Sequence, residues 1–386
     1  MTNSVVKKIT ITILIIVLLV ACISIFAACN GDEIDVDITI KDMKGREITI
    51  NPSKIHKVVC IGAGALRLYT YVGTMDKLCG VERIEGIRDD KVSIRPYQIA
   101  YEDKFKALIE EGKTAGAGGP GNQKSIPKEE LAILEPDVVF SCMSLDVSVI
   151  EDAEKAIGCP IITLAYGSKK AFSSELKESL AIIGAVCCTE DKVLDIVAAM
   201  EYMEKDLDEQ SKTKTSNDVF YIGCNSNWGK NGFLGTAKSP ILSASHIKNV
   251  MSEEGMTISD EGKANLEQVI HSDTTKILLD AGGLEVFKNE YVGELPGTLA
   301  EMTAWKKGEI YLMMPNNAYD ANVEMYYINA YYALSLAYDD ITINMTDKAN
   351  TILETFYGKD MVSYNQVILY GGYQQLNNNP SSWPTK

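Results

Sequence analysis

Histidine is rare in this chain, which contains only His56, His246 and His271. None of them forms an HxH, HxxxH or HExxH spacing, through which two imidazoles reach one metal ion. CxxC pairs are also absent, and these would be needed for a cysteine zinc site. We therefore expect no metal ion held by protein side chains and no resident cofactor.

Basic residues are outnumbered, with 37 Lys and Arg against 53 Asp and Glu and a formal net charge of −16. Binding to nucleic acid needs a basic footprint for the phosphates, so this composition argues against a nucleic-acid-binding function. The Gly-x-Ser-x-Gly elbow of serine hydrolases is missing as well. Nothing in the sequence indicates a catalytic constellation, and we expect a protein that is not an enzyme.

Two glycine-rich stretches come close to nucleotide-binding motifs and fail at a defined position. In the first, Gly62 to Arg67 follows an apolar strand, but Arg67 stands where a dinucleotide fingerprint needs its third glycine. In the second, Gly116 to Gly121 has the spacing of a phosphate loop, but Asn122 replaces the lysine. Neither stretch predicts a nucleotide site.

The N-terminus has the pattern of an export signal, with Lys7 and Lys8 before an apolar run from 9 to 28. Cys29 closes this run and polar residues follow it, so we expect residues 1–29 to be a lipoprotein signal with Cys29 as the lipidated residue, and residues 30–37 to be a tether. Cys22 ends a rival processing box, and an uncleaved membrane anchor is a third reading. The seven later cysteines, an odd number without regular spacing, do not describe a disulfide framework.

One stretch, from Thr189 to Gln210, organises the rest of the chain. Apolar residues recur every three or four positions between Val193 and Leu207, which predicts an amphipathic helix. At 1.5 Å per residue it would be roughly 30 Å long, and Thr189 is a candidate N-cap whose hydroxyl accepts from the first free N–H groups. We expect a connecting helix over 186–212 between an N-terminal lobe over 38–185 and a C-terminal lobe over 213–386.

Strand and helix signals alternate on both sides of this helix. After a hairpin over 38–50, apolar strands are expected at 57–61, 138–140, 161–164, 219–222, 276–279 and 309–312, with helices between them that include 240–251. This alternation predicts an α/β fold with two mostly parallel sheets flanked by helices. Ligands bind beyond the carboxyl ends of such strands, which nominates the loops at 62–67, 141–144, 165–169, 224–235, 280–283 and 314–322.

Several stretches together resemble the substrate-binding lipoproteins of ABC importers for iron chelates, haem and cobalamin. They are Ile40–Ile48, Lys57–Val59 leading to Gly64–Arg67, Glu129–Val139, Asn265–Val269, Lys306–Tyr311 and the Pro315–Glu324 segment. Residues 273–275 lack the Asn-Pro-Asp that is usual in this family. The resemblance covers about residues 38 to 345, and it implies two α/β lobes joined by a single rigid helix.

The resemblance implies a non-enzymatic, monomeric receptor outside the cytoplasm. It would be anchored to the membrane by its N-terminal lipid and would deliver an iron-siderophore-type metal chelate to an ABC permease and its ATPase. Family members dock through one surface glutamate per lobe. By position, Glu129 and Glu324 are the candidates, although both also fit ordinary acids in the first turn of a helix.

The expected ligand residues combine guanidinium donors, aromatic faces and glycine backbone. They are Arg67, Arg95, Tyr97, Gly118, Gly119, Trp228, Lys230, Tyr319 and Asn322. The alternatives are packing roles for Trp228 and the tyrosines, solvated roles for the basic residues, and a flexible connection at the glycines.

Other functions stay open at this point. A haem or cobalamin receptor belongs to the same class, whereas a surface hydrolase or chelatase on the same two-lobe plan and a structural adhesin belong to others. The C-terminal stretch from Asn377 to Pro380 suggests a loose polar end.

Overall fold

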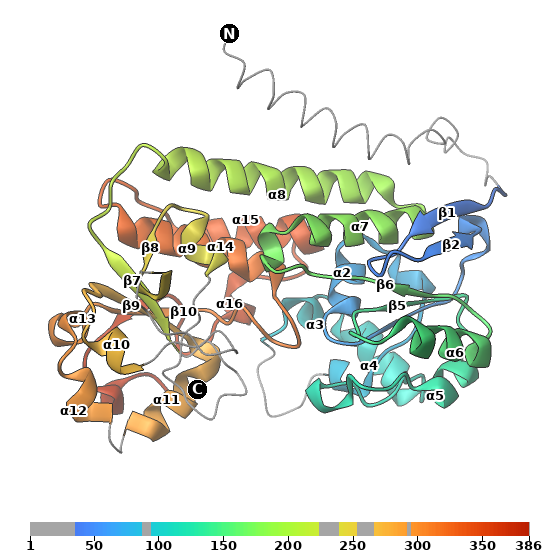
Figure 1. Ribbon diagram of the computed structural model, residues 1–386, viewed down its shortest axis with the longest axis horizontal. Coiled ribbons are helices and arrows are strands. Elements are labelled where there is room, and N and C mark those ends of the chain that lie inside the picture. The colour runs from blue at the N-terminus through green and yellow to red at the C-terminus, as the bar shows by residue number, and fades with distance from the viewer. Residues whose placement is uncertain (1–34, 87–93, 224–238, 253–265, 292–294, 386) are drawn as a thin grey trace, which may run out of the picture.

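The computed structural model describes residues 35–86, 94–223, 239–252, 266–291 and 295–385. Two α/β lobes lie side by side, and one long helix, α8 (Glu190–Ser211), runs over both of them (Figure 1). The expected fold class is therefore confirmed. The predicted domain limits stay a prediction.

The N-terminal lobe is built on a parallel sheet with strand order β4-β3-β5-β6. Every residue of strands β3 and β5 is buried, as expected for a sheet covered by helices on both faces. The strands are β3 (Val58–Ile61), β4 (Leu78–Gly80), β5 (Val138–Ser141) and β6 (Ile161–Thr163). The helices are α2 (Ala65–Val72), α3 (Pro96–Ala100), α4 (Glu102–Glu110), α5 (Lys128–Leu134), α6 (Val147–Ile157) and α7 (Ser174–Cys187).

A separate hairpin precedes this sheet. Strands β1 (Ile38–Lys41) and β2 (Glu47–Ile50) pair antiparallel, with Lys41 opposite Glu47. Gly45 takes a φ of +80° in the turn, a conformation that glycine adopts without steric cost. The Asp42 carboxylate accepts from the backbone of Lys44 and pairs with Arg46, so the predicted hairpin and its turn are both confirmed.

The C-terminal lobe has a five-stranded sheet with the order β11-β10-β9-β7-β8, in which only β11 is antiparallel. Its strands are β7 (Val219–Gly223), β8 (Lys248–Asn249), β9 (Lys276–Asp280), β10 (Ile310–Met313) and β11 (Gln374–Leu376). Its helices are α9 (Pro240–Ser243), α10 (Leu266–Ile270), α11 (Leu284–Tyr291), α12 (Leu295–Leu299), α13 (Thr303–Lys307), α14 (Val323–Ala337), α15 (Met345–Tyr357) and α16 (Tyr364–Val367).

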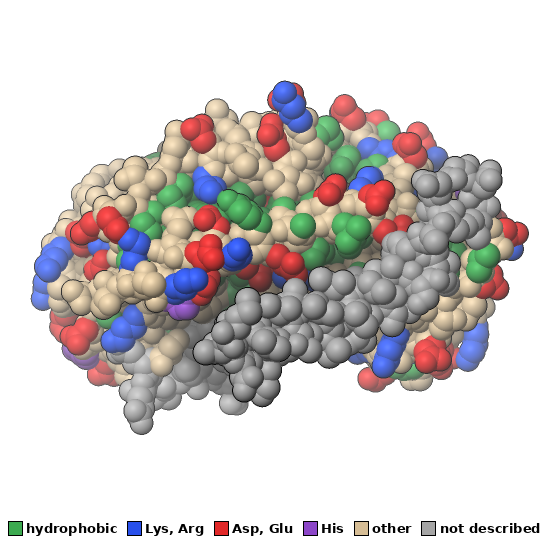
Figure 2. All heavy atoms as spheres, turned by 90° about the horizontal axis from the view of Figure 1, so that it is seen from above, with side chains coloured by type: hydrophobic (Ala, Val, Ile, Leu, Met, Phe, Trp, Pro, Cys, Tyr) green, Lys and Arg blue, Asp and Glu red, His purple; other side chains and the backbone are tan. Residues whose placement is uncertain are grey.

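Helix α8 buries the apolar stripe that the sequence predicts. Val193, Met200 and Leu207 point into the core, and the helix packs on α2 and α7 of the first lobe and on α14 and α15 of the second. The predicted cap is wrong in one respect, because the Thr189 hydroxyl caps no backbone N–H and is buried without a hydrogen-bond partner. The outer face of α8 carries positive and negative side chains interspersed with apolar ones (Figure 2).

Two local predictions need correction. The helix expected over 240–251 ends at Ser243, because His246 adopts a φ of +52° and the chain then enters β8. The C-terminal end is ordered rather than loose. β11 pairs with β10, and Trp383, only 4% exposed, packs on Phe287 and Trp305. Among the described residues, no helix has the length and apolarity that crossing a membrane requires.

Candidate functional site

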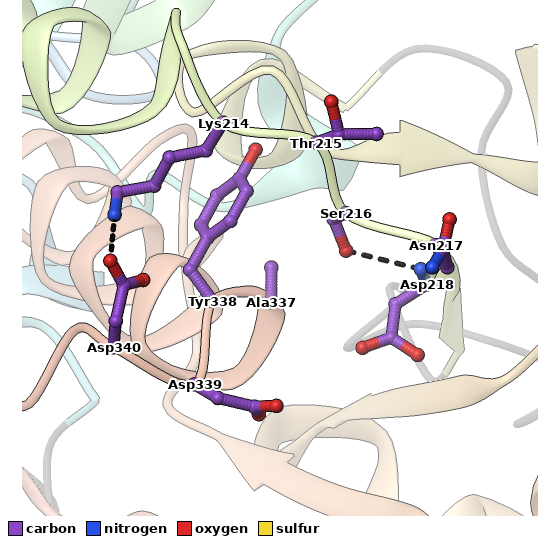
Figure 3. Close-up of a pocket in the computed structure, with 9 residues that line it drawn as sticks. All are labelled: Lys214, Thr215, Ser216, Asn217, Asp218, Ala337, Tyr338, Asp339 and Asp340. Carbon is purple, nitrogen blue, oxygen red and sulfur yellow. Dashed lines mark hydrogen bonds and ion pairs between the residues drawn. The ribbon is translucent and has the colours of Figure 1, made fainter.

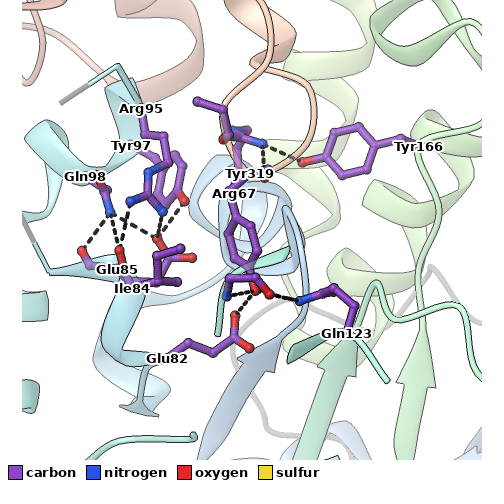
Figure 4. A network of polar contacts seen from close by, with 12 residues as sticks. Arg67, Glu82, Ile84, Glu85, Arg95, Tyr97, Gln98, Gln123, Tyr166 and Tyr319 are labelled. Atoms are coloured by element: carbon purple, nitrogen blue, oxygen red, sulfur yellow. Dashed lines mark hydrogen bonds and ion pairs between the residues drawn. The ribbon is translucent and has the colours of Figure 1, made fainter. Parts of the chain in front are cut away.

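Loops from the carboxyl ends of both sheets meet between the lobes. Arg67 follows β3, Glu82 follows β4 and Tyr166 follows β6, whereas Tyr319 follows β10 of the other lobe. Arg67 bonds to Tyr166 and to the Tyr319 backbone, and the Tyr319 hydroxyl bonds to Glu82 (Figure 4). We call this region the inter-lobe contact. It contains Arg67, Glu82, Glu85, Arg95, Tyr97, Gly119, Gln123, Tyr166, Lys170, Ala318, Tyr319, Asp320 and Asn322.

Arg67 is the central cation of the inter-lobe contact and is completely buried. Its guanidinium donates to the carbonyl oxygens of Ala318 at 2.5 Å and Tyr319 at 3.2 Å. The same group lies over the Tyr97 ring, 4.9 Å from the ring centre, where the negative face of the ring attracts a cation. Arg67 therefore joins the two lobes: both of its terminal nitrogens donate to protein oxygens, whereas Nε is buried without a partner.

The Tyr319 hydroxyl is fully hydrogen-bonded. It donates to Glu82 Oε2 at 2.8 Å and accepts from the Gly119 N–H and from Gln123 Nε2, each at 3.0 Å. Burial raises the pKa of Glu82 to about 7, although the hydrogen bond from Tyr319 opposes this shift. A phenol from the C-terminal lobe is thus held by one acceptor and two donors of the N-terminal lobe.

Arg95 and Tyr97 converge on another buried carboxylate, that of Glu85. Arg95 Nη1 and the Tyr97 hydroxyl lie 3.1 Å and 2.6 Å from Glu85 Oε2, and Gln98 Nε2 donates to the Glu85 carbonyl. Arg95 also lies over the Tyr319 ring, with 5.9 Å between the guanidinium carbon and the ring centre. This group holds the N-terminal side of the inter-lobe contact in position (Figure 4).

The glycine stretch is packed against the segment after β4. Gly118 has a φ of +66°, and a Cβ there would lie 2.6 Å from Ile84 Cγ2 and 2.9 Å from Glu82 Cβ. Gly119 also has a positive φ, of +87°. Only glycine fits both the conformation and the space, which lets the Gly119 N–H reach Tyr319. The Gly119 N–H thus binds a protein side chain, and ligand binding by Gly118 and Gly119 stays a prediction.

Asn322 supports the β10–α14 loop (residues 314–322) from beneath. It is completely buried, and Nδ2 donates to the carbonyl oxygens of Ile94 at 2.9 Å and Pro315 at 3.1 Å. Asp320 of the same loop pairs with Lys170 of the N-terminal lobe at 2.9 Å. The loop is therefore fixed at its base and at its tip.

The two predicted docking glutamates have different surroundings. Glu129 lies exposed in the first turn of α5, as a docking residue must. Glu324 is completely buried, with its carboxylate bonded to the hydroxyls of Tyr71 and Tyr357 at 2.5 Å and 2.9 Å. The prediction of a surface docking role for Glu324 is wrong, because helices α2 and α15 cover its carboxylate. Burial raises the pKa of Glu324, against the opposing effect of Arg67.

Sequence reasoning missed seven members of the inter-lobe contact as individual residues. Ala318 and Asp320 lie inside the loop at 314–322 that the strand-end rule nominated. Tyr166 lies inside a loop that the strand-end rule nominated, and Lys170 comes directly after that loop. Glu82 and Glu85 follow β4, a three-residue strand that the sequence pattern did not reveal. Gln123 comes directly after the glycine stretch and Asn122, where a phosphate loop would carry its serine or threonine. Trp228, Lys230, Cys22 and Cys29 lie outside the described residues.

A different hollow lies at the opposite end of the C-terminal sheet. A cavity of about 430 Å³ is lined by residues 214–218 before β7 and 337–340 after α14 (Figure 3). Lys214 and Asp340 form an ion pair at its edge. The cavity adjoins the amino end of β7, where parallel sheets do not usually bind ligands.

The chemistry available at the inter-lobe contact is recognition by hydrogen bonds and aromatic faces. Within the described ranges, no three His, Cys, Asp or Glu side chains are placed to hold a metal ion. Burial also raises the pKa of Asp280, at the end of β9, to about 7. Its carboxylate accepts from the backbone N–H groups of Gly282 and Asn316, which gives it a structural role at the base of two loops.

This chain resembles known proteins in structure but not in sequence. No protein-family model matches the chain, and no curated protein matches it in sequence. A periplasmic solute-binding protein from Veillonella parvula has a TM-score of 0.60 and 14% identity, over 86% of this chain and 96% of that one. The TroA-like periplasmic binding protein FepB from Veillonella parvula has a TM-score of 0.57 and 14% identity, over 85% and 97%.

The molybdate periplasmic binding protein MolA of Haemophilus influenzae has a TM-score of 0.58 and 17% identity, over 85% of this chain and 99% of that one. These likenesses extend over 85–86% of this chain and 96–99% of the other chains. The chain therefore has the fold of the TroA-like periplasmic binding proteins of ABC transporters.

Proposed function

We propose that this protein is the extracytoplasmic substrate-binding component of an ABC importer and that it is not an enzyme. One observation carries the proposal. The carboxyl ends of two parallel sheets face each other between lobes that a single helix joins, and polar and aromatic loops converge there. This is the arrangement in which α/β proteins bind small molecules. The fold likeness to periplasmic solute-binding proteins supports it.

For the ligand we propose an iron-siderophore-type metal chelate, held between the lobes and released to a permease and its ATPase. Arginine and tyrosine side chains gather at the inter-lobe contact, and they recognise anionic oxygens and flat ring systems. Structures with this fold include MolA bound to molybdate and a nickel–histidine complex of Helicobacter pylori CeuE, which has a TM-score of 0.53 and 14% identity. Lipidation of Cys29 would keep the protein at the membrane.

Ligand binding is the first test. Residues 31–386 are titrated with ferric hydroxamates, ferric catecholates, haem, cobalamin and free metal ions, and thermal unfolding is recorded. A true ligand at a hundred times its Kd adds about 2.7 kcal/mol to the free energy of unfolding. We expect this for a ferric chelate, with the chelate recovered unchanged.

Tryptophan fluorescence gives this titration an internal control. Trp305 and Trp383 pack together in the C-terminal lobe, so a ligand between the lobes should act on Trp228. The Trp228→Phe variant should lose the fluorescence change and part of the thermal shift, because Trp228 is one of the predicted ligand residues. Stabilisation by haem or cobalamin alone would change the ligand class. A chelate altered on incubation would favour a hydrolase or chelatase, and no stabilisation by any compound would favour an adhesin.

Docking on the permease gives a second prediction, which concerns Glu129. Replacing the exposed Glu129 with lysine should reduce uptake of labelled ligand about tenfold and leave the Kd for ligand unchanged, because a reversed rim charge acts on partner orientation. Glu102→Lys is the matched control, since Glu102 is also an exposed acid in the first turn of a helix, α4. Equal uptake by both variants would remove Glu129 from the docking surface.

A further inference from the structure

The β10–α14 loop crosses from the C-terminal lobe into the N-terminal lobe. Tyr319 and Asp320, adjacent at its tip, have φ values of +56° and +68°. Left-handed backbone is unfavourable for residues other than glycine, so two in succession persist only when surrounding contacts hold them. Besides the loop's own Ala318–Asp320 backbone hydrogen bond, the holding contacts come from the other lobe, through Arg67, Glu82 and Lys170.

We propose that the β10–α14 loop is a latch that holds the lobes closed, and that opening requires the Tyr319 hydroxyl to leave Glu82, Gly119 and Gln123. The latch is a property of the protein without ligand. It therefore goes beyond the proposed function, and its test needs neither ligand nor permease.

The latch differs in composition from the rest of the boundary between the lobes. Beneath it, the Tyr71 ring packs on Phe356 and Tyr357, with ring centres 4.8 Å and 5.6 Å apart, and the apolar stripe of α8 covers both lobes. Those contacts would expose apolar surface if they parted. The latch groups are a phenol, carboxylates, an amide and cations, which water can satisfy when they separate. Opening should therefore begin at the loop and pivot on the α2, α8, α14 and α15 side (Figure 1).

The latch should respond to pH through Glu82. The groups that act on this carboxyl are Tyr319 of the loop, Glu85, Arg95 at the start of α3 and the Gly62 N–H. Glu82 in turn acts on the thiols of Cys60, which is buried, and Cys142, which is partly buried. Burial raises the pKa of Glu82 from 4.5 to about 7 and outweighs the Tyr319 hydrogen bond, which favours the charged form, so the closed state favours the protonated form. The closed state is most stable below pH 4.5 and loses stability as the pH rises to about 7, where the loss is complete.

The experiment measures lobe opening directly in ligand-free protein. Fluorescent labels on non-natural amino acids replace Ile133 of α5 and Met361, which are both exposed and lie in different lobes, and single-molecule energy transfer reports the distance between them. Tyr319→Phe removes one hydroxyl and keeps the ring. We expect the fraction of open molecules to rise about tenfold, because the closed state loses the hydrogen bonds of the Tyr319 hydroxyl. Tyr338→Phe is the matched control, since its hydroxyl bonds to Ser245 within the C-terminal lobe.

A second variant keeps the proposal testable if Tyr319→Phe folds poorly. In the wild type, the open fraction should increase between pH 4.5 and 7, and Glu82→Gln should abolish this increase because a neutral amide does not titrate. A distance distribution in Tyr319→Phe identical to that of the wild type would overturn the latch. So would an open fraction in the wild type that does not change with pH.

Discussion

Replacing Arg67 with methionine should lower the free energy of unfolding by about 2–6 kcal/mol, because each of two buried carbonyl oxygens left without its donor costs about 1–3 kcal/mol. The guanidinium is completely buried and bonds to two backbone carbonyl groups of the other lobe. Its charge also opposes the rise in pKa that burial imposes on Glu324. Methionine fills much of the volume but leaves these oxygens without a donor and Glu324 without a nearby cation.

Urea unfolding followed by circular dichroism would measure this loss. Arg83→Met is the matched control, because Arg83 is exposed and bonds through its side chain to Thr114 at the surface. The double variant Arg67→Met, Glu324→Gln should recover part of the stability, since the buried carboxylate is then neutral. A loss below about 1 kcal/mol in Arg67→Met would contradict this prediction. It would mean that the favourable contacts of Arg67 in the wild type are already offset by two costs, the burial of its charge and the lack of a hydrogen-bond partner for Nε.

Replacing Trp383 with alanine should cost about 3–5 kcal/mol, as for other large aromatic residues removed from a core. The indole stacks on Phe287, with ring centres 5.4 Å apart and planes 12° apart, and it lies 6.0 Å from Trp305. Its Nε1 donates to the Asn377 carbonyl at 2.7 Å, which folds the C-terminal segment back on the lobe. The side chain therefore holds a segment that carries little other apolar surface.

The unfolding midpoint in urea would again be measured, with Ser381→Ala as the control in the same segment. Ser381 is exposed, so its replacement should change stability by less than about 0.5 kcal/mol. If Trp383→Ala unfolds at the same urea concentration as this control, residues 377–385 contribute nothing to the C-terminal lobe. The interpretation of Trp383 as a core residue would then be wrong.

The sheets were predictable because their strands are short, apolar and fully buried, as β3 and β5 show. The α8 helix was predictable because its stripe repeats over six turns. The prediction of a helix over 240–251 was wrong for a physical reason. Ile241, Leu242 and Ile247 have a spacing compatible with a helix, and the helix is ended by the left-handed backbone of His246, which this spacing does not reveal. Strand β11 lies within the last thirteen residues and is formed by pairing with a distant partner, which no local pattern reveals.

For the candidate site, the strand-end rule identified the loops but not the partners within them. Arg67 and Tyr319 are 252 positions apart in the chain, and their contact depends on how the lobes sit together. Glu324 looks like a surface acid from its place at a helix start. Its burial depends on Tyr357, which arrives on a later helix. Side chains that suit ligand recognition also suit recognition of one another, and the sequence alone does not separate these two uses.

The burial of helix α14 affects how the chain folds. Thirteen of its fifteen residues are buried, and it packs on α8, α9 and α15. Its Tyr327 hydroxyl donates to the Ala171 carbonyl in the first lobe. A helix that is buried on nearly all sides gets most of its stability from the elements packed around it. The N-terminal lobe therefore cannot reach its final form until residues 323–337 have been synthesised, and the two lobes should unfold in one cooperative transition rather than as separable halves.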